Sequence, residues 1–309
     1  MKTKTITWMT GCLVACLVAC GGDGSKDFEI PGFPGTSDPD TEQPPVFERY
    51  DLSVHTGWAE LPAVDNDSED LYYAAHFCTG LPGGWNYSIC YSAENRITFW
   101  SAFPLHECYK GDQSRSDAWA YDPELPQSIQ PALTNGSYQP QPGYSKGHLL
   151  ASSDRTVSYA ANVQTFYVTN VAPQWQNGFN SGVWSSLEED CWKNICADTL
   201  YVVSGVYGVH ATDEVTDKSG RKCTVPSHFY RVLLRSKAGN TGRKVQDLSA
   251  DELQCVGFWF ENKRYENGTM PLAYMTSVAE IERKTGMTFF VNVPNAPKEI
   301  FDKTAWKFR

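Results

Sequence analysis

No apolar run in this chain of 309 residues is long enough to cross a bilayer as a helix, which takes about 20 residues. The best candidate, residues 6–19, is shorter than that. Internal repeats, the P-loop and the G-x-G-x-x-G turn are also missing. Repeat architectures and the nucleotide-binding folds built on those two turns are therefore not expected.

A block of basic residues is lacking as well, although such a block is typical of nucleic-acid-binding tails. The formal net charge is −10. The acidity is concentrated in residues 20–70, which hold 13 acidic and 2 basic side chains, whereas residues 71–309 hold 23 and 22. The charge of the main part of the chain thus argues neither for nor against a polyanionic substrate.

The amino terminus resembles the signal of a bacterial lipoprotein. Lys2 and Lys4 precede the apolar run, as in the charged and apolar regions of a secretory signal. The run ends in LVAC at residues 17–20, which is similar to a lipobox and predicts cleavage before Cys20 and lipid attachment to its thiol. We expect an exported protein, held at the outer membrane or cell surface through lipidated Cys20. The alternative is an ordinary signal peptide with a chance cysteine.

The sequence predicts three segments: a signal peptide over 1–19, a flexible acidic tether over 20–50 and one domain over 51–309. The tether is dominated by Gly, Pro, Ser and Asp and shows no apolar period, so it has no means of forming a core. No break in composition divides the remaining residues.

Cysteine pairs with the C-x₂-C spacing of zinc sites are absent. Three of the ten cysteines lie at or before Cys20. An oxidising compartment would favour disulfides among the other seven, and because seven is odd, one thiol stays free or pairs outside the domain. The sequence leaves the pairing open for Cys78, Cys90, Cys108, Cys191, Cys196, Cys223 and Cys255.

Several apolar segments predict strands. Residues 86–103 read as two strands joined by a turn at Glu94-Asn95, and the capping box Ser277-Val-Ala-Glu280 opens a helix that Gly286 closes. Many strands with few helices between them predict an α+β fold with a largely antiparallel sheet. Further strands are expected at 200–205, 229–235, 257–263 and 287–294.

His148 lies in the segment GYSKGHLLASSDRT, residues 143–156, between a glycine and two leucines. A histidine in such a setting can be a core residue, a metal ligand or a catalytic base. The segment alone does not choose among the three.

A second polar constellation follows at residues 162–192. Residues 164–170 predict a strand, residues 171–179 a loop, and Asn180 the start of a helix running to Trp192. On such a helix the Cα atoms of Asn180 and Glu188 would lie about 12 Å apart along the axis and about 80° apart around it. Asn180 could hold a metal ion directly, and Glu188 could reach that ion only through water. Alternatively, Asn180 is a plain N-cap and Glu188 a solvated side chain.

Together these segments resemble the DNA/RNA non-specific endonucleases of the ββα-metal (His-Me finger) fold, which carry D-R-G-H, T-N-x-x-P-Q and N-x-G-x-W-x-x-L-E motifs. The resemblance covers roughly residues 55–300. It implies an α+β fold with a ββα-metal active-site motif. The matching segments are Ser145-Lys146-Gly147-His148, Thr169-Asn170-Val-Ala-Pro173-Gln174 and Asn180-Ser-Gly182-Val-Trp184-Ser-Ser-Leu187-Glu188.

Two positions depart from the family pattern. The Asp-Arg before Gly-His is Ser145-Lys146 here, and lysine lacks the planar fork of arginine that matches phosphate. Four residues after the family glutamate an arginine is frequent, but this chain has Trp192 followed by Lys193.

The resemblance implies a metal-dependent endonuclease that hydrolyses phosphodiester bonds of DNA and RNA without sequence specificity. His148 would be the general base for the attacking water. One Mg²⁺, with Mn²⁺ as the alternative, would be held by Asn180. No protein partner is inferred.

Four further residues receive roles from the same resemblance. Lys146 and Arg96 would stabilise charge on the phosphate. Asn170 would orient His148 or the water shell of the metal, and Glu188 would anchor that shell.

Two alternatives remain open at this stage. One is a catalytically weakened, nuclease-like surface lipoprotein that binds glycan or protein. The other keeps the chemistry but acts on teichoic-acid-like or lipid phosphodiesters.

Overall fold

The computed structural model describes residues 49–140 and 143–309. The residues from 47 to 309 form one compact unit. The predicted signal peptide, Cys20 and nearly all of the tether lie outside the described residues. No helix within the described ranges is both long and apolar enough to cross a membrane.

A seven-stranded sheet forms the centre of the domain, and each pair of neighbouring strands is antiparallel. This confirms the predicted α+β class. The hairpin expected over 86–103 is present as the second and third strands. In sheet order the strands are β1 (Leu71–Phe77), β2 (Trp85–Ser92), β3 (Ile97–Leu105), β6 (Leu200–Tyr207), β9 (His228–Ser236), β10 (Leu253–Glu261) and β11 (Met275–Thr276).

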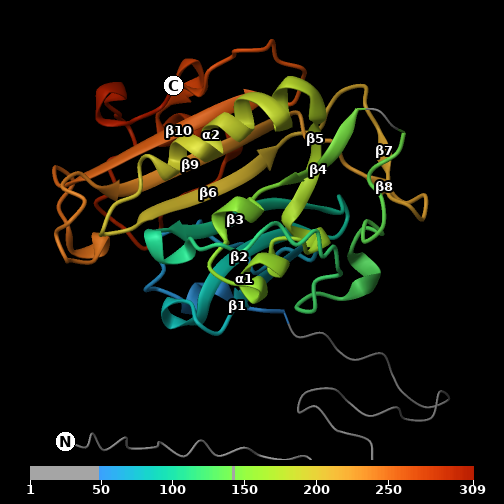
Figure 1. Cartoon of the computed structure of the whole chain (residues 1–309), viewed down its shortest axis with the longest axis horizontal. Helices are drawn as coiled ribbons and strands as arrows, with labels where there is room; N and C mark the ends of the chain where they lie inside the picture. Colours follow the sequence, from blue (N-terminus) through green and yellow to red (C-terminus); the bar gives the residue numbers. More distant parts are fainter. Residues whose placement is uncertain (1–48, 141–142) are drawn as a thin grey trace, which may run out of the picture. The chain divides into compact units, whose positions relative to one another are not determined.

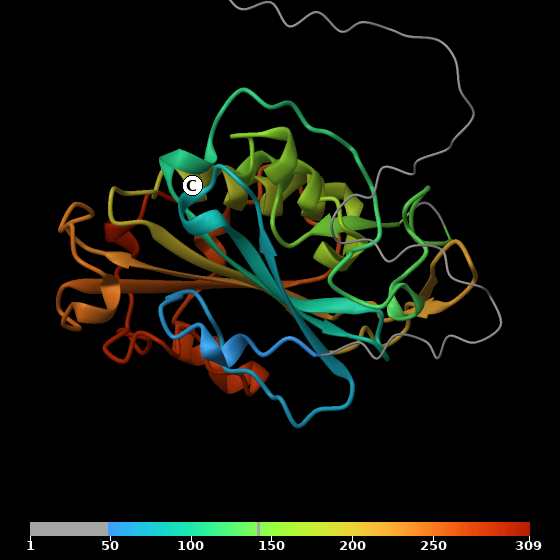
Figure 2. The same cartoon turned by 90° about the horizontal axis from the view of Figure 1, so that it is seen from below.

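Both faces of the sheet are covered, so the domain has three layers (Figures 1 and 2). One face packs against α1 (Tyr159–Gln164) and α2 (Ser185–Trp192), and Trp184 and Leu187 enter that core. The other face packs against α3 (Val278–Thr285) and the first described residues. The strands are therefore buried on both sides, and nearly every residue of β2 and β10 is buried.

The helix start and stop predicted at α3 are confirmed, but only the Ser277 half of the capping box forms, because the Glu280 carboxylate pairs with Arg283 and Lys284 instead. Ser277 Oγ accepts a hydrogen bond from the Glu280 amide at 3.1 Å, and Gly286 ends the helix with φ of 74°. That positive φ is the conformation that glycine adopts without strain.

A two-stranded ribbon beside the sheet contains the Ser145-Lys146-Gly147-His148 segment. It pairs β4 (Tyr144–His148) with β5 (Val171–Trp175) in antiparallel register. The strand predicted over 164–170 was therefore wrong, because those residues end α1 and form a 3₁₀ turn. The side chain of Asn170 bonds the chain elsewhere, as described below, and the strand begins only after it.

The strand predicted over 287–294 is also wrong, because no strand forms there. Phe289 and Phe290 are instead buried in the apolar core between the sheet and α3. The Phe289 amide donates to Glu282 Oε1 at 2.8 Å rather than to a strand, and the edge of the sheet is β11. A separate small hairpin joins β7 (Val215–Thr216) and β8 (Lys222–Cys223).

The seven cysteines of the domain all carry free thiols, so the disulfides expected from the sequence are not formed in this structure. Five are buried and are distributed over four different apolar clusters, where they pack as small apolar side chains.

Candidate active site

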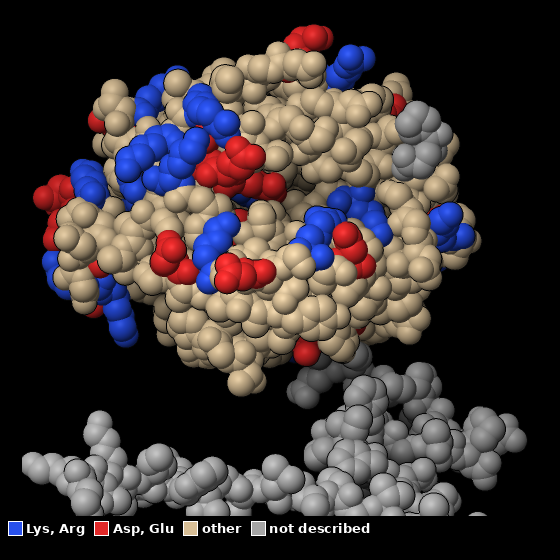
Figure 3. Space-filling model, viewed as in Figure 1, with Lys and Arg blue, Asp and Glu red and all other residues tan. Residues whose placement is uncertain are grey.

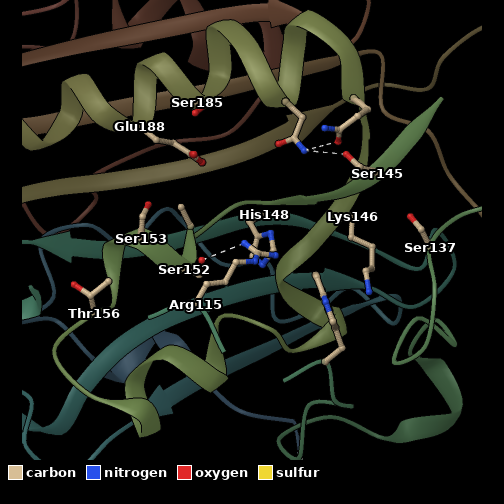
Figure 4. Close-up of a pocket in the computed structure, with 14 residues that line it drawn as sticks. Arg115, Ser137, Ser145, Lys146, His148, Ser152, Ser153, Thr156, Ser185 and Glu188 are labelled. Atoms are coloured by element: carbon tan, nitrogen blue, oxygen red, sulfur yellow. Dashed lines mark hydrogen bonds between the residues drawn. The ribbon is translucent and has the colours of Figure 1, made fainter. Parts of the chain in front are cut away.

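One pocket of about 760 Å³ opens where β4, the irregular segment η7 (Gln176–Trp184) and α2 converge. Figure 3 shows the hollow with acidic atoms along one side and basic atoms along the other. Figure 4 shows its lining residues. They are Arg115, Trp119, Ser137, Ser145, Lys146, His148, Ala151, Ser152, Ser153, Thr156, Gln176, Asn180, Ser185 and Glu188.

His148 ends β4 at the middle of this pocket. Its ring is wedged between Trp119 and Phe166, with ring centroids at 5.1 and 5.2 Å. The preceding Gly147 is required by packing, because a Cβ there would lie 2.3 Å from the Cβ of Gln174. The Nε2 atom has no hydrogen-bond partner in the described part of the chain.

The imidazole of His148 is held in its neutral form. Burial lowers its pKa to about 3, and the positive charges of Arg115 and Lys146 act in the same direction. A hydrogen bond with the Lys146 backbone opposes this shift without overcoming it. His148 therefore lines the pocket as a neutral imidazole, the protonation state from which a general base starts.

Asn180 lies within η7, not at the start of α2, so the prediction that it opens the helix is wrong. Gly178, with φ of 77°, turns the chain just before it, and a Cβ at Gly178 would lie 2.0 Å from the Tyr265 carbonyl oxygen. The amide nitrogen of Asn180 donates to Ser145 Oγ at 2.9 Å and to Gln176 Oε1 at 3.0 Å. These bonds fix the amide orientation and leave Oδ1 without a donor from the described residues.

Glu188 projects from α2 into the same pocket (Figure 4). Its Oε1 lies 3.6 Å from Nη2 of Arg231, whose side chain is fully buried in β9. Burial raises the pKa of Glu188 to about 7, although Arg231 pulls it down. The solvated alternative for Glu188 is thereby excluded, since its side chain is only 16% exposed.

Lys146 lines the pocket from β4. Its Nζ lies 3.3 Å from the ring centroid of Trp119 and donates to the Leu133 carbonyl at 3.1 Å. Burial lowers the pKa of the ammonium to about 8, while Asp117 partly restores it. Lys146 therefore offers a positive charge in a fixed place.

Arg115 lines the pocket and was missed by the sequence analysis. It donates to Asp117 Oδ1 at 2.8 Å and to Ser152 Oγ at 3.2 Å. It lies in a connecting loop with no periodic pattern, and only the polar run Ser-Arg-Ser-Asp at residues 114–117 hinted at it.

Two predicted site residues do not line the pocket. Asn170 is fully buried and clamps the backbone after His148, because its Nδ2 donates to the Leu150 carbonyl at 2.8 Å and its Oδ1 accepts from the Leu150 amide at 3.1 Å. Arg96 lies in the β2–β3 turn and donates to the Lys222 carbonyl at 3.2 Å. Arg96 is not among the residues that line the pocket around His148, whereas Arg115 is.

The donor set suits a hydrated hard divalent cation. No group of three or more His, Cys, Asp or Glu side chains in the two described ranges could hold a metal ion. Asn180 and Glu188 both line the pocket, and the amide oxygen of Asn180 accepts no hydrogen bond from the described residues. One protein oxygen with water filling the other positions is a binding mode typical of Mg²⁺, which gives up its waters reluctantly.

Comparisons with known proteins agree on one family. The family model of DNA/RNA non-specific endonucleases matches residues 85–296. A nuclease of Nostoc sp. is 28% identical over 70% of this chain and 76% of its own length. Mitochondrial endonuclease G of Bos taurus is 26% identical over 75% and 76%, respectively.

Among solved structures, a chain in the crystal structure of the EndoG/EndoGI complex matches with a TM-score of 0.51 and 22% identity. The match covers 67% of this chain and 84% of that one. This likeness supports the fold alone.

Proposed function

The chain belongs to the DNA/RNA non-specific endonuclease family, a family of metal-dependent nucleases, and from that membership we propose that the pocket around His148 hydrolyses phosphodiester bonds of DNA and RNA. The observation that carries the proposal is the neutral imidazole of His148 in the lining of a pocket that also holds Arg115 and Asn180.

His148 takes a proton from the water that attacks phosphorus. The depressed pKa of His148 keeps its ring neutral, so the base is ready over the whole physiological pH range. Arg115 and Lys146 offset the negative charge that grows on the phosphate oxygens. The leaving oxygen takes its proton from solvent, which the open pocket admits.

Asn180 would hold the metal through Oδ1, with Ser145 and Gln176 fixing the amide. When bound, the ion supplies Lewis-acid stabilisation of charge on the phosphate and leaving oxygen. Mg²⁺ fits this donor chemistry, and Mn²⁺ fits as an alternative. Glu188 would anchor the water shell, and Asn170 would position His148 by holding Leu150.

Purified protein incubated with supercoiled plasmid or with RNA, with and without Mg²⁺, tests the activity. The wild type should nick and degrade both substrates only with the metal. His148→Ala should lose activity by about 10²–10⁴-fold with an unchanged melting temperature. If no divalent metal supports cleavage by the wild type, the alternative of a surface lipoprotein that binds glycan or protein replaces the nuclease proposal. Cleavage of lipid or teichoic-acid-like phosphodiesters alone would favour the alternative of a phosphodiesterase for those substrates.

We further propose that cleavage is sequence-independent. Sequence is read by contacts to base edges, and the charged and polar groups of this pocket suit a phosphate instead. Sequencing the ends of early fragments tests this, and a fixed motif at the cut sites would contradict it.

We also propose export and lipid anchoring, supported by LVAC at residues 17–20. Labelled palmitate should enter the full-length chain in a bacterial host and should not enter Cys20→Ser. Labelling of both forms, or of neither, would contradict lipidation at Cys20.

A further inference from the structure

A lysine outside the lining of the pocket stands at one of its ends. Lys110 follows β3, and its Nζ donates to the Ser153 carbonyl at 2.9 Å. Ser153 itself lines the pocket. The same ammonium lies 3.8 Å from the ring centroid of Trp192. Because Trp192 is four residues after Glu188 on α2, its side chain continues the face of the helix that Glu188 presents to the pocket.

The backbone around Lys110 is fixed to this rim. The Gly111 amide donates to Thr156 Oγ1 at 3.0 Å, and Thr156 also lines the pocket. A Cβ at Gly111 would lie 2.7 Å from the Thr156 carbonyl oxygen, so the two segments are in close contact. The amides of Thr156 and Val157 both donate to the Tyr109 carbonyl at 3.1 Å. Lys110 therefore projects from a segment whose backbone is held by hydrogen bonds to Thr156 and Val157.

No salt bridge with a carboxylate of the described residues holds Lys110, although the negative charges of Asp154 and Glu107 act on its ammonium. Its partners are a carbonyl and an indole face. Asp154 lies close to Lys110; its Oδ1 accepts from Trp192 Nε1 at 2.6 Å, and its Oδ2 has no hydrogen-bond partner among the described residues. An ammonium has three donors. Those not used by Ser153 remain for an anion.

The pocket is elongated, and its cations are spread along it. In Figure 4, Ser153 and Thr156 lie at one end, Lys146 and Ser137 at the other, and His148 with Arg115 between them. Lys110, bonded to Ser153, adds a positive charge at the end away from Lys146. A polynucleotide carries one negative charge per nucleotide, so its phosphates can meet these cations in succession.

We propose that Lys110 binds the phosphate next to the one cleaved at His148, so that the site favours a polynucleotide over a compound with a single phosphodiester. This inference rests on the proposed function. Trp192 acts as a positioning residue, since its ring holds the ammonium at the rim.

The test compares two substrates that differ in neighbouring phosphates: a dinucleoside monophosphate and a single-stranded decanucleotide. Lys110→Ala should lower kcat/KM for the decanucleotide by about ten- to 100-fold, mainly through KM, because a charge-assisted contact is lost. Its cleavage of the dinucleoside monophosphate should stay within twofold. The slope of log(kcat/KM) against log[salt] for the decanucleotide should become shallower by about 0.7, the value for one contact to a single strand.

Lys110→Arg should keep most of the preference for the longer substrate. Lys193→Ala is the matched control, since Lys193 follows Trp192 but forms an ion pair with Asp190 at 2.6 Å. Lys193→Ala should leave kcat/KM unchanged for both substrates. Equal losses on both substrates with Lys110→Ala would show a purely structural role and overturn the proposal, as would no loss on either.

Binding of a fluorescent decanucleotide in EDTA separates this inference from the proposed function. Weaker binding by Lys110→Ala supports the contact even if the wild type cleaves nothing, which would refute only the nuclease proposal. Unchanged binding and unchanged cleavage of the decanucleotide would refute the Lys110 contact. Melting temperatures of all variants identify any loss caused by unfolding.

Discussion

The amide nitrogen of Asn180 lies 2.9 Å from the hydroxyl of Ser145, 35 residues earlier in the chain. This bond joins η7 to β4 and turns the Asn180 oxygen away from both of its hydrogen-bonded neighbours. Ser145 stands where the family motif has an aspartate, and here its neutral hydroxyl accepts the bond from Asn180.

Ser145→Ala should weaken metal binding more than catalysis at saturation. Without the hydroxyl the Asn180 amide is held only by Gln176, and losing such an outer partner costs roughly ten- to 100-fold in metal affinity. Titration of activity with Mg²⁺ measures this as a shift of the half-maximal concentration. Ser145→Thr retains the hydroxyl and should shift it little, whereas equal curves for Ser145→Ala and wild type would remove Ser145 from this role.

Lys146→Ala should lower the rate by about ten- to 150-fold, since a charge-assisted contact with the phosphate is worth roughly 1.5–3 kcal/mol. Lys146→Arg should keep or raise the activity, provided that the guanidinium fits over Trp119. Steady-state cleavage of a short oligonucleotide at fixed Mg²⁺ measures both. An alanine variant within twofold of wild type would mean that Lys146 only stacks on Trp119.

Glu188→Gln should flatten the dependence of stability on pH. The pKa of Glu188 is about 7 in the folded protein, above its value of 4.5 in a free side chain, so the folded state binds the proton more tightly. Its contribution is therefore complete below about pH 4.5 and is lost as the pH rises to about 7. This loss is on the order of 3 kcal/mol.

Denaturant unfolding at pH 4.5, 6 and 8 in EDTA checks this. The change in unfolding free energy between these pH values should differ between Glu188→Gln and wild type by up to that amount. The difference between pH values is the informative quantity, because the glutamine also leaves the buried Arg231 without its carboxylate. Parallel pH profiles would contradict the prediction.

Asn170→Ala should destabilise the domain by about 2–4 kcal/mol, since buried backbone groups at Leu150 and Thr165 lose their partners. Chemical denaturation measures the loss. Asn177→Ala, an exposed asparagine in the same region, is the control and should stay within about 0.5 kcal/mol of wild type. A similar small effect at Asn170 would show that the clamp is not needed for folding.

The sequence correctly predicted those elements that are determined by residues close together in the chain. The β2–β3 hairpin and the Ser277–Gly286 helix fall in this class, because a turn or a cap is decided within a few residues. Residues 164–170 misled the prediction, since their apolar and β-branched sequence suits a strand but Asn170 bonds the backbone of Leu150 instead.

The site was predictable where a motif carried it and not elsewhere. His148, Lys146, Asn180 and Glu188 line one pocket, as their motifs implied. Arg115 reaches that pocket from a loop whose path depends on tertiary contacts. Arg96 is not in the lining and donates to the Lys222 carbonyl, a placement that could not be read from the sequence.

Arg231 connects the parts of the site through the middle of the sheet. Its guanidinium donates to Ser204 Oγ at 2.7 Å and to the carbonyl of Leu149, the residue after His148, at 3.3 Å, while facing Glu188. A survey of inactivating substitutions would therefore single out position 231 as strongly as the residues that touch substrate. During evolution, a substitution of Arg231 would require compensating changes on both sides of the pocket, near Leu149 and at Glu188.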